Sequence, residues 1–98
     1  MNVQVNNQVR TWMTARAQAE KNMFNSKCTE AAGNDLSTWR NVGRQIHDYR
    51  VSGNFRCVAT KTGGGSGAPG DTFTIQAIYR HAGSGGKQKV TGNTVGNY

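Results

Sequence analysis

Residues 72–80, TFTIQAIYR, decide the fold, because apolar and polar residues alternate through this stretch. An extended chain places every second side chain on the same side, so four apolar residues share one side: Phe73, Ile75, Ala77 and Tyr79. This period of two predicts a half-buried β-strand. Residues 55–60 alternate in the same way. We therefore expect the two segments to be neighbours in an antiparallel sheet.

Turn-forming residues delimit these strands. A Gly-rich loop over 63–70, which includes Pro69, separates the two, and residues 82–86 form a second turn. A short third strand over 87–91 follows. We expect the strands within 54–92 to form a three-stranded antiparallel meander, with residues 92–98 as a flexible tail.

The first half of the chain shows helical periodicity instead. One long amphipathic helix is predicted over 5–27, where apolar residues fall within one arc: Val5, Val9, Trp12, Met13, Ala17, Ala19, Met23 and Phe24. A second helix is predicted over 35–50, capped by Asn34 or Asp35, with an apolar stripe at Leu36, Trp39, Val42, Ile46 and Tyr49. The predicted fold class is α+β. Two amphipathic helices pack on the three-stranded antiparallel meander within a single small basic domain, 1–98.

The charge of the chain indicates a class of partner. Twelve Lys and Arg residues stand against five Asp and Glu residues among 98, a formal net charge of +7. Such an excess attracts polyanions, and nucleic acid backbone is the partner that we expect. Strand alternation places Arg56 and Arg80 on one side of the sheet, without an aromatic residue for base stacking. The alternative is a solvated basic surface with no ligand. The candidate nucleic-acid-binding residues are Arg40, Arg44, His47, Arg56, Arg80, Lys87 and Lys89.

The two cysteines leave a second function open. A disulfide between Cys28 and Cys57 would stabilise a thin core by about 3–4 kcal/mol. Such a bridge implies an extracellular, periplasmic or virion location, whereas reduced thiols imply the cytoplasm. Residues 1–9 lack an export signal, so we expect the chain to be either intracellular or already trimmed. Met1 is accordingly either the native first residue or not part of the natural protein. The alternative function is an exported, disulfide-stapled envelope, pilus, secretion-type or virion structural subunit. An exposed sheet edge would permit its self-assembly.

Catalysis, metals and cofactors find less support in the sequence, so we favour a binding module over an enzyme. A small ribonuclease-type toxin is the third hypothesis, with His47 beside Arg44 or His81 beside Arg80 moving a proton and stabilising charge on phosphorus. No closely spaced Cys or His pair predicts a metal site. The Gly-rich segments lack the strand-to-helix context of nucleotide loops, so no cofactor is expected. No apolar run is long enough to span a membrane.

Overall fold

The computed structural model describes residues 2–63, 70–82, 86–96 and 98. The elements follow in the order β1 (Asn2–Val5), α1 (Asn7–Thr14), α2 (Gln18–Ala32), β2 (Arg40–Gly43), β3 (Ile46–Ser52), β4 (Phe55–Gly63), β5 (Thr72–Ala82) and β6 (Gly86–Gly92). Within these described ranges, the six strands form one mixed sheet. The predicted α+β class is therefore correct, but the three-stranded antiparallel meander is wrong.

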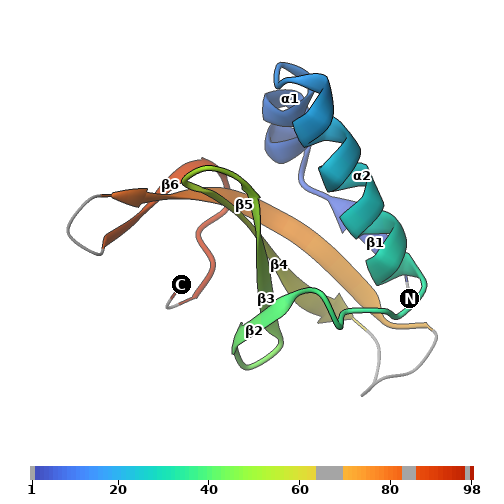
Figure 1. Cartoon of the computed structure of the whole chain (residues 1–98). Coiled ribbons are helices and arrows are strands. Elements are labelled where there is room, and N and C mark those ends of the chain that lie inside the picture. Colours follow the sequence, from blue (N-terminus) through green and yellow to red (C-terminus); the bar gives the residue numbers. More distant parts are fainter. Residues whose placement is uncertain (1, 64–69, 83–85, 97) are drawn as a thin grey trace.

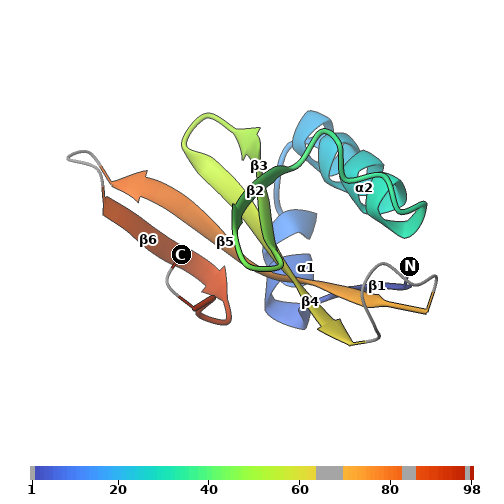
Figure 2. The same cartoon turned by 90° about the horizontal axis from the view of Figure 1, so that it is seen from below.

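Strand β5 is the centre of the sheet (Figure 2). The strands follow the order β1-β5-β4-β3-β2, and β6 also pairs with β5. β1 runs parallel to the start of β5, with Asn2 opposite Thr72, whereas β6 runs antiparallel to its second half, with Ala77 opposite Gly92. The other neighbours are antiparallel. The predicted pairing of the three C-terminal strands is thus present, but it makes up only part of the sheet.

The single helix predicted over 5–27 is wrong. Its first residues form β1, and Asn6 then caps α1 by accepting a hydrogen bond from the N–H of Gln8 at 2.8 Å. α1 stops at Thr14, Ala17 is extended with φ −60° and ψ 151°, and α2 continues to Ala32. The break contains neither Gly nor Pro, so the sequence carries no strong signal for it.

The helix predicted over 35–50 is also wrong, because this segment forms the β2–β3 hairpin. Asn34, proposed as a helix cap, has φ 63° and follows the end of α2 instead. Gln45, with φ 60°, lies in the hairpin turn. The alternation of buried Tyr49 and Val51 with exposed Arg50 is strand periodicity, and β-branched and aromatic residues favour a pleated, half-buried surface. Pairing with β4 therefore outweighs the helical spacing of the stripe.

The sheet has two different sides (Figure 1). Helices α1 and α2 cover one side, here called the helix side, and enclose the larger core around Phe24, Phe73 and Ile75. The chain after β6 crosses the opposite side, here called the tail side, where Val95 packs in a smaller cluster with Val58, Ala77 and Tyr79.

The tail predicted to be flexible over 92–98 is docked at its described residues. The N–H of Val95 donates to the hydroxyl of Tyr79 at 3.1 Å, and the rings of Tyr98 and Tyr79 meet edge to face at 4.8 Å. Val95 is 4% exposed. Residues 64–69 of the predicted Gly-rich loop lie outside the described residues.

A β-bulge in β5 changes which residues share a side. Val58 lies opposite Ala77 but Ala59 lies opposite Ile75, so Gln76 is the extra residue. As a result, Ile75 belongs to the helix-side core and Ala77 and Tyr79 belong to the tail-side cluster. The single apolar side predicted for residues 73–79 is therefore divided between both sides of the sheet.

Gly92 is the position at which the chain leaves β6 for the tail side. Its φ is +93°, and a Cβ there would lie 2.1 Å from the carbonyl oxygen of Gln76. Only glycine fits both the backbone angle and the close approach. The N–H of Asn93 then donates to that same carbonyl oxygen at 2.9 Å, which starts the tail across the sheet.

Candidate functional site

A row of cations crosses the tail side of the sheet. Arg50 lies directly opposite Arg56, Arg56 opposite Tyr79, and Tyr79 opposite Lys89. Directly opposed residues project to the same side of a sheet, so Arg50, Arg56 and Lys89 share the side that carries Tyr79. We call these three residues the cation row. Lys87 lies two residues before Lys89 on β6 and therefore projects to the same side.

One nitrogen of this row has no partner. Nη1 of Arg56 is buried and forms no hydrogen bond with the described residues. A buried donor left without an acceptor costs about 1–3 kcal/mol. The row therefore contains a cation whose hydrogen-bonding capacity is unfilled.

Asp48 is the sole carboxylate within the described residues of the six strands, and its charge is already neutralised. Nη2 of Arg40 lies 2.8 Å from Oδ2 of Asp48, and the hydroxyl of Tyr98 donates to the same oxygen. Burial raises the pKa of Asp48, but the hydrogen bonds from Arg40 and Tyr98 and the charge of Arg40 hold it below its usual value. Asp48 thus stays ionised and paired beside the row.

The excess of positive charge lies mainly on the sheet. Four of the twelve Lys and Arg residues form ion pairs, and the remaining eight form none with the described residues. Two of these eight, Arg10 and Lys21, are on the helices. The other six lie on the sheet and its β2–β3 turn: Arg44, Arg50, Arg56, Arg80, Lys87 and Lys89.

Hollows flank the tail on this side. One of about 410 Å³ is lined by Arg44, Lys87 and Tyr98, with residues of β2 and β3. A second, of about 470 Å³, is lined by Arg44, Lys61 and the tail residues 93–96. Residues of β2 and β6, which are far apart in the strand order, line the same hollow. The sheet is therefore curled, so that Arg44 and Lys87 border one space. Nζ of Lys87 lies 4.1 Å from the ring centroid of Tyr98.

The structure brings together only some of the predicted binding residues. Arg56, Lys87 and Lys89 share the tail side, Arg44 borders its hollows, and Arg40 is held by Asp48. The prediction that Arg56 and Arg80 share a side is wrong: the bulge in β5 places Arg80 opposite Phe55, on the helix side, where its Nη2 donates to Oε1 of Gln88 at 2.9 Å.

His47 also lies apart from the cation row. It pairs with Ala59 on the helix side, and its ring centroid is 5.9 Å from that of Phe73. Burial lowers the pKa of His47, more than the nearby Asp48 charge raises it, so the ring is neutral at pH 7.

The two pairs proposed for phosphodiester cleavage do not converge. Arg80 and His81 are adjacent in β5 and therefore project to opposite sides. Arg44 borders the tail-side hollows, whereas His47 is on the helix side. In the described part of the chain, no three His, Cys, Asp or Glu side chains are grouped as a metal would require. None of the described helices has the length and apolar character to cross a membrane.

Both cysteines are free thiols, so the possible Cys28–Cys57 disulfide is absent from the structure. Cys57 is fully buried on β4, and Cys28 of α2 packs at the margin of the same core. Burial raises the pKa of Cys28 to about 11, against a lowering by Arg10. Each thiol therefore acts as a small apolar side chain. The hypothesis of a disulfide-stapled exported subunit is left without its disulfide.

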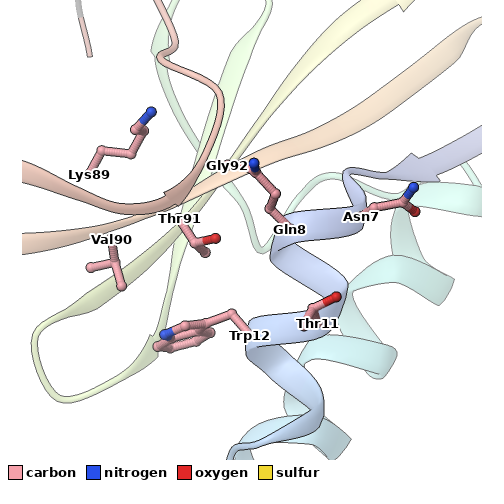
Figure 3. Close-up of a pocket in the computed structure, with 8 residues that line it drawn as sticks. All are labelled: Asn7, Gln8, Thr11, Trp12, Lys89, Val90, Thr91 and Gly92. Carbon is pink, nitrogen blue, oxygen red and sulfur yellow. The ribbon is translucent and has the colours of Figure 1, made fainter.

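Two aromatic residues near the surface were not predicted as site residues. Tyr98 was assigned to a flexible tail, and no sequence pattern indicates its contact with Asp48. Trp12 was assigned to the apolar stripe of a helix, although it also lines a groove between α1 and β6 (Figure 3). Known proteins do not help to interpret this site: no protein-family model matches the chain, and no curated protein or solved structure is significantly similar to it.

Proposed function

We propose that this protein is a non-enzymatic module that binds nucleic acid through the phosphate backbone, using the tail side of its sheet. The observation that carries the proposal is the cation row of Arg50, Arg56 and Lys89, together with the neutralisation of the one strand carboxylate, Asp48. Cations without carboxylate partners attract phosphates, and the attraction requires no particular base sequence.

The size of the row fits a nucleic acid strand. Neighbouring strands lie about 4.8 Å apart, so three strand spacings from Arg50 to Lys89 amount to about 14 Å. Along a stacked strand the nucleotides rise about 3.4 Å each along the helix axis, and successive phosphates lie farther apart than this because the backbone winds around that axis. The row is therefore long enough to meet more than one phosphate of a strand.

Arg56 supplies a specific contact. A guanidinium binds phosphate through two parallel hydrogen bonds, and the buried Nη1 of Arg56 has a donor to offer. Because this nitrogen is buried, the guanidinium must turn outward to meet a phosphate oxygen, and that contact would remove the cost of leaving the donor unsatisfied. We therefore expect Arg56 to contribute more to binding than the exposed Arg50.

The salt dependence of binding tests the proposal. Fluorescence anisotropy of a labelled oligonucleotide should show affinity falling steeply between about 50 and 200 mM salt, as is typical when several cations neutralise phosphates. The double variant Arg50→Gln with Arg56→Gln should reduce the slope of log K against log salt by about 1 for each phosphate contact removed.

A matched control separates the tail side from net charge. Arg10→Gln with Lys21→Gln removes the same charge from the helices, where these two residues border a different hollow. The control should leave the slope close to that of the unmodified protein. Affinity that does not change with salt, or a control that reduces the slope as much as the tail-side variant, contradicts the proposal.

A further inference from the structure

The largest hollow described lies between α1 and the outer edge of β6 (Figure 3). Its volume is about 650 Å³, and four residues of each element line it. Small-molecule sites have volumes of roughly 300–1,000 Å³. The groove is therefore large enough for a planar ring with its attached groups.

The lining of the groove combines apolar and hydrogen-bonding groups. Trp12 and Val90 supply the apolar surface, while the amides of Asn7 and Gln8 and the hydroxyls of Thr11 and Thr91 supply donors and acceptors. Among the described residues that line it there is no carboxylate, and the charged one is Lys89 at the rim. This chemistry suits a flat heterocycle that carries polar edges and is attached to an anion.

Trp12 is held in position from outside the groove. Its ring meets that of Phe55 edge to face at 5.1 Å, and Cζ of Arg16 lies 4.5 Å from its centroid. Arg16 is in turn fixed by Glu20, with Nε 3.2 Å from Oε2. A ring fixed in this way binds a flat partner without first losing conformational freedom.

A bulge in β6 brings the groove next to the cation row. Tyr79 lies opposite Lys89 and Ile78 opposite Thr91, so Val90 is the extra residue. Figure 3 shows Val90 and Thr91 directed toward Trp12, whereas the side chain of Lys89 points away from it. One edge strand therefore presents a cation to the tail side and an apolar residue to the groove.

We infer that this groove accepts an unpaired nucleobase, and that the ligand of the proposed function is single-stranded nucleic acid. This inference rests on the proposed function. Phosphates lie along the cation row and beside Lys87, and a base turns around the edge of β6 to stack against Trp12. A base inside a duplex is paired and stacked on its neighbours, so it cannot enter the groove.

Competition between strand types tests this inference. An oligonucleotide of mixed sequence is compared, by anisotropy at 50 mM salt, as a single strand and annealed to its complement. Stacking of one base on an aromatic side chain favours binding by about tenfold or more. The unmodified protein should prefer the single strand by about that factor, and Trp12→Ala should remove the preference while leaving duplex affinity and its salt slope unchanged.

Intrinsic fluorescence provides a second readout that leaves Trp12 in place. The chain has two tryptophans, and Trp39 is buried at 6% exposure against Tyr49. In a Trp39→Phe variant the emission of Trp12 should be quenched when the single strand saturates the protein. In the matched Trp12→Phe variant the emission of Trp39 should not change. This measurement decides the question even where Trp12→Ala impairs folding.

The outcomes separate this inference from the proposed function. Equal affinity for single strand and duplex, together with unchanged Trp12 emission, overturns the nucleobase site and leaves backbone binding intact. Absence of binding to either form at low salt overturns both. Tight binding of the single strand that persists in Trp12→Ala, with the variant folded by circular dichroism, also overturns the assignment of the groove.

Discussion

The two sides of the sheet differ in what they bury and in what they leave charged. The helix side holds the larger apolar core, with Phe73 and Ile75 at 1% and 0% exposure beneath two helices. The tail side holds a smaller cluster, in which Val95 of the C-terminal segment packs on Val58, Ala77 and Tyr79, and charged side chains surround it. Burial of apolar area is the main stabilising term in folding. The helix side therefore dominates stability, and the apolar burial there can offset the cost of the unpaired cations on the tail side.

The largest effect that tests this difference is expected on the helix side. Phe73→Ala removes a buried ring that also meets Trp39 edge to face at 5.5 Å. We expect the free energy of unfolding to fall by about 3–5 kcal/mol, measured by urea denaturation. A loss no greater than that of the tail-side variants below would contradict the division of roles.

The next effect concerns the ionised carboxylate of the tail side. Asp48→Asn weakens the hydrogen bonds from Arg40 and Tyr98 and should cost about 2 kcal/mol at pH 7. The pKa of Asp48 is lowered in the folded protein, so its stabilisation is complete above the usual carboxyl pKa of about 4 and is lost as pH falls through the folded-state value. Denaturation of both proteins at pH 7 and at pH 3 measures this. An equal difference at both pH values would contradict it.

A smaller effect tests whether the tail is docked in solution. Val95→Ala removes two buried methyl groups at about 0.8 kcal/mol each, a loss of about 1.5 kcal/mol. In the unmodified protein, the Val95 N–H bonded to Tyr79 should be protected in amide hydrogen exchange. Rapid exchange of this amide, with no change in stability, would show a free tail and a more open cation row.

The smallest effect on stability is expected at the cation row itself. Arg50→Gln alters an exposed side chain without an ion pair among the described residues, so the free energy of unfolding should change by less than about 0.5 kcal/mol. Thermal unfolding by circular dichroism is sufficient to measure it. A larger loss would mean that Arg50 has a structural role, and the comparison with binding data would need a different variant.

Sequence periodicity predicted the C-terminal half of the sheet and failed where two periods overlap. Residues 55–60, 72–80 and 87–91 are strands, as alternation indicated. The segment 35–50 has apolar residues that satisfy helical spacing, and the pairing with β4 that makes it a hairpin is not visible locally. The break between α1 and α2 has no Gly or Pro, so tertiary packing decided it.

The candidate site was predictable in its composition but not in its arrangement. The net charge of the chain predicted that basic residues would form the site. It could not show which of them share a side, because the extra residue Gln76 in β5 moves Arg80 to the other side of the sheet from Arg56. A bulge depends on how two strands align, and alternation in one strand cannot reveal it. The position of Trp12 at a groove depends likewise on the edge of β6, which lies far from it in sequence.

Gly92 borders the groove beside Trp12 and also begins the segment that crosses the tail side. Because a Cβ at this position would meet the Gln76 carbonyl at 2.1 Å, any chain that retains this crossover must retain a glycine here. The residue is therefore an anchor for recognising distant relatives: a basic strand that ends in glycine, followed by an aromatic-containing tail, is a sequence signature that can be searched for when overall similarity has faded.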